Sequence, residues 1–202
     1  MKIAADVPKT NEITHLKLTH NGWTQIQEPE TSSKAILLSI PFMLAASIFS
    51  LLIISLFSDI TLKDFGISKD SLIITINLGV IVSFILLVIV HELLHLIFIP
   101  GFARSKKTTV GLTIWGGFVA TEEELSRKRY LLVTLAPFVI LTVIVPMLLG
   151  VFGLMTTTFK WLIFLNAIGS SVDLLIAAMI LKQVPRGAIL IQNGQRTYWK
   201  SA

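Results

Sequence analysis

Three ionisable side chains lie together inside one of the longest apolar stretches of the chain. His91, Glu92 and His95 stand in the run VIVHELLHLIF. Two histidines four positions apart share one face of an α-helix, so both rings can present a nitrogen to a single metal ion. Glu92 would then contact the water on that metal without being a ligand. The spacing predicts a metal site, with a cluster that only bonds helices together as the alternative.

A third protein ligand is needed, because catalytic zinc usually binds three protein groups and one water. The chain has no histidine after His95 and no cysteine at all. Asp173 is the carboxylate inside a later apolar stretch, and it lies about as far from the end of that stretch as Glu92 does from the end of its own, roughly 10 to 12 Å at 1.5 Å per residue. We predict that His91, His95 and Asp173 bind Zn²⁺ and that Glu92 is catalytic.

Asn166 precedes Asp173 by seven residues and would share its face on a continuous helix. An amide there would donate a hydrogen bond to a ligand or to the oxyanion formed during hydrolysis. An asparagine that bridges two helices is an equal alternative. The small residues Gly169, Ser170 and Ser171 would allow close helix packing nearby.

The elements that position these residues are predicted to be membrane helices. Apolar residues make up 53% of the chain, charged residues only 14%, and the mean hydropathy is +0.79. This composition excludes an ordinary soluble domain, in which about a quarter of the residues are charged. Windows long enough to cross about 30 Å of hydrocarbon occur at 35–57, 71–99, 130–153 and 158–181. We therefore expect an all-α integral membrane protein with four transmembrane helices, forming a single domain over 1–202.

The basic residues predict the orientation of the chain. Of 17 lysines and arginines, 14 fall in the N-terminal segment 1–34, the loop 100–129 and the tail 182–202. Because cytoplasmic loops carry the excess of positive charge, these segments and both termini are expected to be cytoplasmic. The basic residues flank apolar blocks and do not alternate with aromatic residues, which indicates the bilayer and not nucleic acid as the partner.

The loop after the histidine motif shows a strand pattern. Residues 108–115 alternate β-branched and other side chains, and Gly116-Gly117 follows. The pattern predicts a short cytoplasmic β-hairpin whose edge strand would hold an extended peptide beside the metal. A connector lying on the membrane surface is the alternative. Thr121 and Glu124 have capping-box spacing, which predicts that the third helix begins there.

The HELLH run in a membrane helix, with a carboxylate on a later one, resembles the site-2 protease type of intramembrane metallopeptidase. The layout of the whole chain is similar to a bacterial family of integral-membrane zincin peptidases known largely as a domain of unknown function. That layout joins the Gly22-Trp23 approach to the first helix, the HELLH motif, and the segments 126–137, 169–173 and 185–188. The resemblance covers most of residues 20–200, although only HELLH is specific by itself. It implies a multi-pass protein of a bacterial cytoplasmic membrane.

Three hypotheses follow for function. The first is a membrane zinc endopeptidase whose substrate is another membrane or membrane-proximal protein, locally unwound because a helix hides its carbonyls from attack. The second is a non-proteolytic metal-binding or accessory protein of the cell envelope. The third is an ion or metal transporter, which four helices without internal symmetry disfavour.

Overall fold

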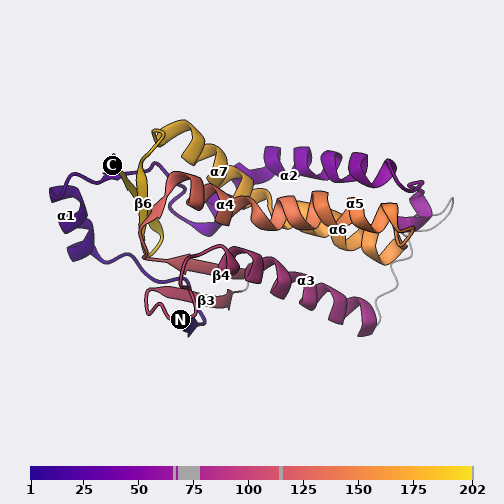
Figure 1. Ribbon diagram of the computed structural model, residues 1–202, viewed down its shortest axis with the longest axis horizontal. Helices are drawn as coiled ribbons and strands as arrows, with labels where there is room; N and C mark the ends of the chain where they lie inside the picture. The colour runs from indigo at the N-terminus through magenta and orange to yellow at the C-terminus, as the bar shows by residue number, and fades with distance from the viewer. Residues whose placement is uncertain (66, 68–77, 114–115, 202) are drawn as a thin grey trace. The chain divides into compact units, whose positions relative to one another are not determined.

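The computed structural model describes the chain except for residues 66, 68–77, 114–115 and 202 (Figure 1). The elements are, in chain order, β1 (Lys2–Ala4), α1 (Glu12–His20), β2 (Thr24–Gln25), α2 (Ser32–Ser55), the 3₁₀-helix η1 (Leu62–Phe65), α3 (Leu78–Ile97), β3 (Thr108–Thr113), β4 (Gly116–Thr121), β5 (Leu125–Ser126), α4 (Arg127–Pro137), the π-helix η2 (Phe138–Ile144), α5 (Val145–Val151), α6 (Thr157–Gly169), α7 (Ser171–Gln183), β6 (Ile189–Asn193) and β7 (Arg196–Lys200).

The chain divides into two compact units. Unit 1 comprises residues 1–39, 92–136 and 172–202, and unit 2 comprises residues 40–91 and 137–171. The division falls inside α3, between His91 and Glu92, so one continuous helix carries the HELLH motif across it.

The expected all-α fold is wrong, because unit 1 contains two β-sheets. One has the strand order β1-β3-β4, with β1 parallel to β3 and β3 antiparallel to β4. The other has the order β2-β7-β6-β5 and is antiparallel throughout. The first sheet contains the expected hairpin after the histidine motif, although residues 114 and 115 lie outside the described residues.

The second sheet arises from segments that the sequence analysis treated as cytoplasmic flanks. β6 and β7 pair from Ile189–Lys200 to Asn193–Arg196. The two residues of the turn are Gly194 and Gln195, and Gly194 adopts a positive φ of +62°, which glycine does without steric cost. β2 from the N-terminal segment adds to β7, so the two ends of the chain lie in one sheet.

The core of unit 1 fixes α7 against this second sheet. Residues in or directly next to β2, β5, β6, α4 and α7 form one buried apolar cluster, namely Ile26, Leu125, Tyr130, Ile180, Val184, Ala188 and Leu190. Burying side chains of this size removes a large apolar area from water, at about 25 cal/mol per Å². The helix that carries Asp173 is therefore held by the sheet, and not only by neighbouring helices.

The predicted set of four transmembrane helices also needs correction. Among the described residues, the single helices long and apolar enough to cross a membrane are α2, α3 and the continuous stretch Arg127–Val151. The fourth window, 158–181, is two helices, α6 and α7, that meet at a 41° bend. The break falls at Ser170, whose ψ of 1° leaves the helical region. Residues 71–77 of the second window lie outside the described residues.

The predicted third transmembrane helix begins later than expected, at Arg127, and its middle is a π-helix. Thr121 ends β4, so the predicted cap at that residue is wrong and α4 starts at Arg127. Pro137 and Pro146 flank the π-helix η2. Proline removes a backbone donor from a helix, which frees the carbonyl four residues earlier.

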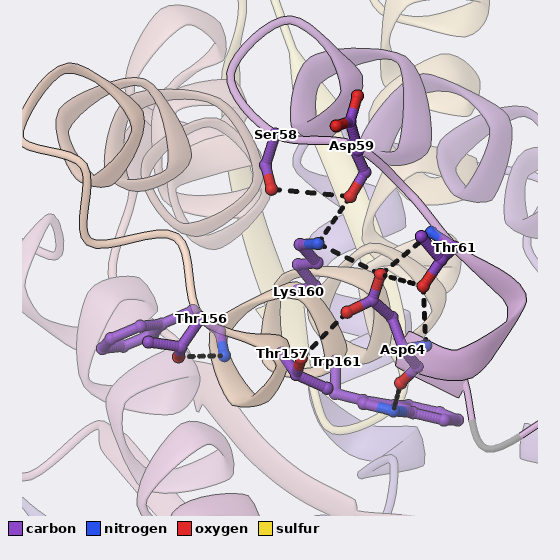
Figure 2. Close-up of polar contacts among 9 residues, drawn as sticks. Ser58, Asp59, Thr61, Asp64, Thr156, Thr157, Lys160 and Trp161 are labelled. Atoms are coloured by element: carbon purple, nitrogen blue, oxygen red, sulfur yellow. Dashed lines mark hydrogen bonds and ion pairs between the residues drawn. The ribbon is translucent and has the colours of Figure 1, made fainter.

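In unit 2, a polar cluster fastens the 58–65 loop to the first turn of α6 (Figure 2). Lys160 Nζ lies 3.1 Å from Asp64 Oδ2 and donates to the carbonyl oxygen of Asp59 at 2.6 Å. Thr157 Oγ1 donates to Asp64 Oδ1, and Trp161 Nε1 donates to the carbonyl oxygen of Asp64. We call these residues, together with Thr61, the Asp64–Lys160 cluster. It anchors the helix that also carries Asn166.

Candidate metal centre

His95 is buried, and a backbone carbonyl of α4 orients its ring. Its ring nitrogen Nδ1 lies 2.7 Å from the carbonyl oxygen of Val133, which can only accept, so Nδ1 carries the proton. That carbonyl is available because Pro137, four residues later, has no N–H to donate to it. The proline thus frees the acceptor that orients the histidine. The other ring nitrogen, Nε2, faces Asp173.

His91 is oriented in the same way by an asparagine. Its Nδ1 lies 2.9 Å from Asn166 Oδ1. The amide nitrogen of Asn166 donates to Thr142 Oγ1 at 3.0 Å and to the carbonyl oxygen of Pro137 at 3.3 Å. These two acceptors fix which end of the amide is oxygen, so His91 Nδ1 is the donor. Thr142 lies in the π-helix, an irregularity that often marks functional sites.

Both histidines therefore use Nδ1 as a hydrogen-bond donor. In the neutral ring, the remaining nitrogen, Nε2, then carries the lone pair that a metal requires. Histidine ligands in metalloproteins characteristically donate their other N–H to a carbonyl or carboxylate, which fixes tautomer and ring direction. His91 and His95 have this second contact in place.

Asp173 stands where a third ligand belongs. Its Oδ2 lies 3.5 Å from His95 Nε2, and both side chains are largely buried. Two ligands at about 2.0 to 2.1 Å from a tetrahedral zinc ion lie roughly 3.3 to 3.4 Å apart. His91, His95 and Asp173 each offer a ligand atom, and these atoms lie within 4.8 Å of one another. His95 and Asp173 belong to unit 1, and His91 is related to His95 by one turn of a continuous helix.

The donor set fits zinc. Two imidazole nitrogens and one carboxylate oxygen form a standard catalytic zinc triad, which leaves a fourth position for water or substrate. Within unit 1, the fold brings His95 and Asp173 together from two separate apolar stretches, and α3 places His91 one turn from His95. The backbone carbonyls of Val133 and Pro137, which accept from His95 and Asn166, were not predicted from the sequence. The sequence does contain one signal for the first of them, because Pro137 follows Val133 by four residues and has no N–H to donate to its carbonyl.

Asn166 lies beside His91 and not on the helix of Asp173. The expectation that the two share one helical face fails, because the helix breaks at Ser170 between them. The Asn166 amide hydrogens are directed to Thr142 and Pro137. Its contact with the site is through the oxygen that accepts from His91.

Gly117 on β4 packs against Glu92. A side chain at this position has no room, since a Cβ built there would lie 2.6 Å from Glu92 Oε1. β4 is the last strand of its sheet in the order β1-β3-β4. An edge strand therefore passes directly beside the predicted catalytic carboxylate, and the Gly116-Gly117 pair is the sequence signal for this close approach.

Comparison with known proteins gives one match. A family model described as "Putative zincin peptidase" matches residues 84–189, which is more than half of the chain and includes the HELLH motif and Asp173. No curated protein and no solved structure matches the chain.

Proposed function

Because the chain belongs to the family described as "Putative zincin peptidase", we propose that it is a membrane-embedded zinc endopeptidase acting on membrane or membrane-proximal proteins. The observation that carries this proposal is the convergence of His91, His95 and Asp173 beside Glu92. A metallopeptidase site requires this combination of three ligands and an adjacent carboxylate.

Each residue of the proposed site has its own role in hydrolysis. Zinc, when bound, polarises the scissile carbonyl and lowers the pKa of water. His91 and His95 supply neutral Nε2 atoms, held in direction by Asn166 and by the Val133 carbonyl. Glu92 takes the proton from the attacking water and delivers it to the leaving amine. Asp173 supplies the anionic ligand.

The edge of β4 is the surface on which the substrate would lie. Hydrolysis needs an accessible carbonyl, and a helical peptide hides its carbonyls in intrahelical bonds. A peptide that adds as a strand to β4 would be extended and would pass Glu92 at Gly117. Backbone hydrogen bonds would hold such a peptide without strong dependence on its sequence.

We place the protein in a bacterial cytoplasmic membrane. α2, α3 and the stretch Arg127–Val151 are long and apolar enough to cross it, and the bent pair of α6 and α7 would carry the chain back to the side on which it began. The N-terminal segment and the C-terminal tail are strands of one sheet in unit 1, so both lie on the same side. Because these segments carry most of the basic residues, that side is the cytoplasm.

The proposal is tested with the purified, zinc-loaded full chain and β-casein, an unfolded protein, as the probe. Wild type should produce discrete cleavage products detected by mass spectrometry. Glu92→Gln should bind zinc equally well and cleave at least about 100-fold more slowly, because a general base contributes 10²- to 10⁴-fold. Glu124→Gln, which changes an exposed carboxylate of the same unit, is the matched control and should cleave normally.

Equal cleavage by wild type and Glu92→Gln would refute the role of Glu92. If zinc binds to four protein ligands and no probe or host membrane protein is cleaved, the peptidase proposal fails. The chain would then be a metal-binding or accessory protein of the cell envelope.

A further inference from the structure

A cavity of about 200 Å³ lies along β4 in unit 1. Three consecutive residues of the strand, Phe118, Val119 and Ala120, line it. Successive side chains of a strand point to opposite faces of the sheet. Side chains alone would therefore bring every second residue to a cavity on one face. Three consecutive lining residues indicate that the backbone edge of β4 forms part of the cavity wall. The cavity therefore borders the strand edge along which the proposed substrate would lie.

The distance from the catalytic carboxylate follows from the strand. Gly117 contacts Glu92, and Phe118 to Ala120 follow it directly. At about 3.3 Å per residue, the cavity extends from roughly 3 to 10 Å along the strand beyond the contact with Glu92. A peptide paired with β4 would place there a side chain that lies one to three residues from the scissile bond.

The charges lining this cavity are acidic. Its described lining contains Glu28 and Glu30 but no lysine or arginine. Glu30 forms an exposed ion pair with Lys34 at 2.7 Å, so its charge is largely offset. Among the described residues, no lysine or arginine forms an ion pair with Glu28. Glu28 thus supplies the uncompensated charge of the cavity.

Glu28 is held rigidly in this position. The backbone N–H of Thr197 donates to Glu28 Oε2 at 2.7 Å, and Thr197 Oγ1 donates to Oε1 at 2.9 Å. Each carboxylate oxygen has a second lone pair, so the group can still accept from a ligand. Burial raises the pKa of Glu28 against these two hydrogen bonds. A cation placed beside it would favour the charged form.

The remaining walls suit a long aliphatic stem. Pro29, Ala35, Phe118 and Ile176 are among the residues that line the cavity. Arginine and lysine side chains bury such stems on apolar surface while the charged end reaches a polar partner. A guanidinium also matches a carboxylate in two parallel hydrogen bonds.

We propose, resting on the proposed peptidase function, that this cavity is a specificity pocket for a basic side chain of the substrate, with Glu28 as the residue that recognises its charge. The pocket makes the peptidase selective for arginine or lysine one to three residues from the bond it cleaves. Charge complementarity at this position supplements the sequence-independent hydrogen bonds along β4.

The pocket can be tested by binding, without any cleavage. The chain has no cysteine, so Gln195→Cys at the exposed rim takes a single trifluoromethyl label for fluorine NMR. The probes are two acetylated pentapeptide amides, Val-Thr-Arg-Thr-Val and the same peptide with uncharged citrulline for arginine. In the zinc-loaded Glu92→Gln background, the arginine peptide should bind about tenfold more tightly.

Variants assign the difference to Glu28. Glu28→Gln should abolish the preference for arginine, and Glu28→Asp should keep part of it. Glu30→Gln is the matched control and should keep the preference, because Lys34 already offsets its charge. If Glu28→Gln does not fold, Ala35→Lys, which puts an amine on the pocket wall, should have the same effect. Equal binding of the two peptides, or an equal loss in Glu28→Gln and Glu30→Gln, would overturn the proposal.

The cleavage pattern separates this pocket from the peptidase function. Wild type should cut β-casein preferentially where arginine or lysine lies one to three residues from the bond, and Glu28→Gln should lose that enrichment. Cleavage without enrichment leaves the peptidase standing and removes the pocket. Discrimination between the two peptides without any cleavage leaves the cation pocket and removes the peptidase.

Discussion

The Asp64–Lys160 cluster of unit 2 and the Asp173–His95 pair of unit 1 both bury a carboxylate beside a basic side chain. In the first, both oxygens of the carboxylate accept hydrogen bonds from neighbouring side chains or backbone. Oδ1 accepts from Thr157, and Oδ2 accepts from Lys160 and from the N–H and hydroxyl of Thr61. Lys160 also donates to the Asp59 carbonyl. This cluster is closed and has a structural role.

The second pair is arranged differently. His95 Nε2 and Asp173 Oδ2 are 3.5 Å apart, longer than the 3.1 Å between Lys160 and Asp64. The opposite side of the His95 ring is fixed by the Val133 carbonyl. The spacing is longer than a good hydrogen bond and close to the edge of a zinc tetrahedron.

This difference separates a buried polar group that could bind a metal from one that stabilises the fold. Burial alone does not indicate catalysis, since Lys160 and His95 are both buried. What distinguishes the candidate centre is that Asn166 and the Val133 carbonyl orient its two histidines, whose ligand atoms lie within 4.8 Å of one another and of one from Asp173.

The largest effect is expected from removing the carboxylate of each cluster. Asp173→Ala should weaken zinc binding on the order of a thousandfold, or about 4 kcal/mol, because one of three protein ligands is lost. Asp64→Ala should lower stability and leave zinc affinity unchanged. Zinc affinity is measured by competition with a chelator. Equal zinc loss in both variants would mean that Asp173 acts only through folding.

The next effect concerns stability. Lys160→Met leaves Asp64 as a buried charge without its cation, which should cost about 3 kcal/mol in the free energy of unfolding. The double variant Lys160→Met with Asp64→Leu should recover part of this loss, since no isolated charge remains. Unfolding of the purified protein in detergent measures both. A Lys160→Met protein as stable as wild type would show that the cluster contributes no net stability.

The sequence predicted the family of the chain correctly and its architecture incorrectly. HELLH predicts two ligands and a base from spacing on one helix, because that geometry is local. Asp173 was predicted as the third ligand because few carboxylates lie in apolar stretches. The sheet β2-β7-β6-β5 was missed because its strands are short and lie in polar flanks, although Gly194 was a usable turn signal.

The break between α6 and α7 was hidden for a related reason. A continuous hydropathy window over 158–181 cannot register one residue, Ser170, that leaves the helical conformation. The error moved Asn166 onto the wrong helix face. The role of the Val133 carbonyl could not be predicted from the residue type, because every residue carries a backbone carbonyl. Only Pro137, four residues later, marks the freed group.

A smaller effect is expected from the brace behind His91. Asn166→Leu removes the acceptor of His91 Nδ1 and should weaken zinc binding by about 10- to 100-fold, as is typical when such a contact to a metal ligand is lost. Asn166→Asp retains an acceptor oxygen and should lose less. The isosteric Thr157→Val, on the same helix but in the Asp64–Lys160 cluster, is the control and should leave zinc affinity unchanged. Equal affinities in wild type and Asn166→Leu would contradict the orienting role.

The smallest effect appears only in acid. The backbone N–H of Thr61, more than any other contact, lowers the pKa of Asp64 well below its ordinary value of 3.8, with Thr157 and Lys160 adding to it. A carboxylate with a lowered folded pKa contributes stability above its ordinary pKa and loses that contribution as pH falls toward the folded value. The difference in unfolding free energy between wild type and Asp64→Asn should therefore stay constant from pH 7 to about 5 and shrink below about 4. The measurement uses metal-free protein, so that release of zinc does not contribute. A difference that widens on acidification would mean that Asp64 is protonated more readily in the folded than in the unfolded chain, and the cluster could not then be the closed, charge-stabilising counterpart of the metal centre.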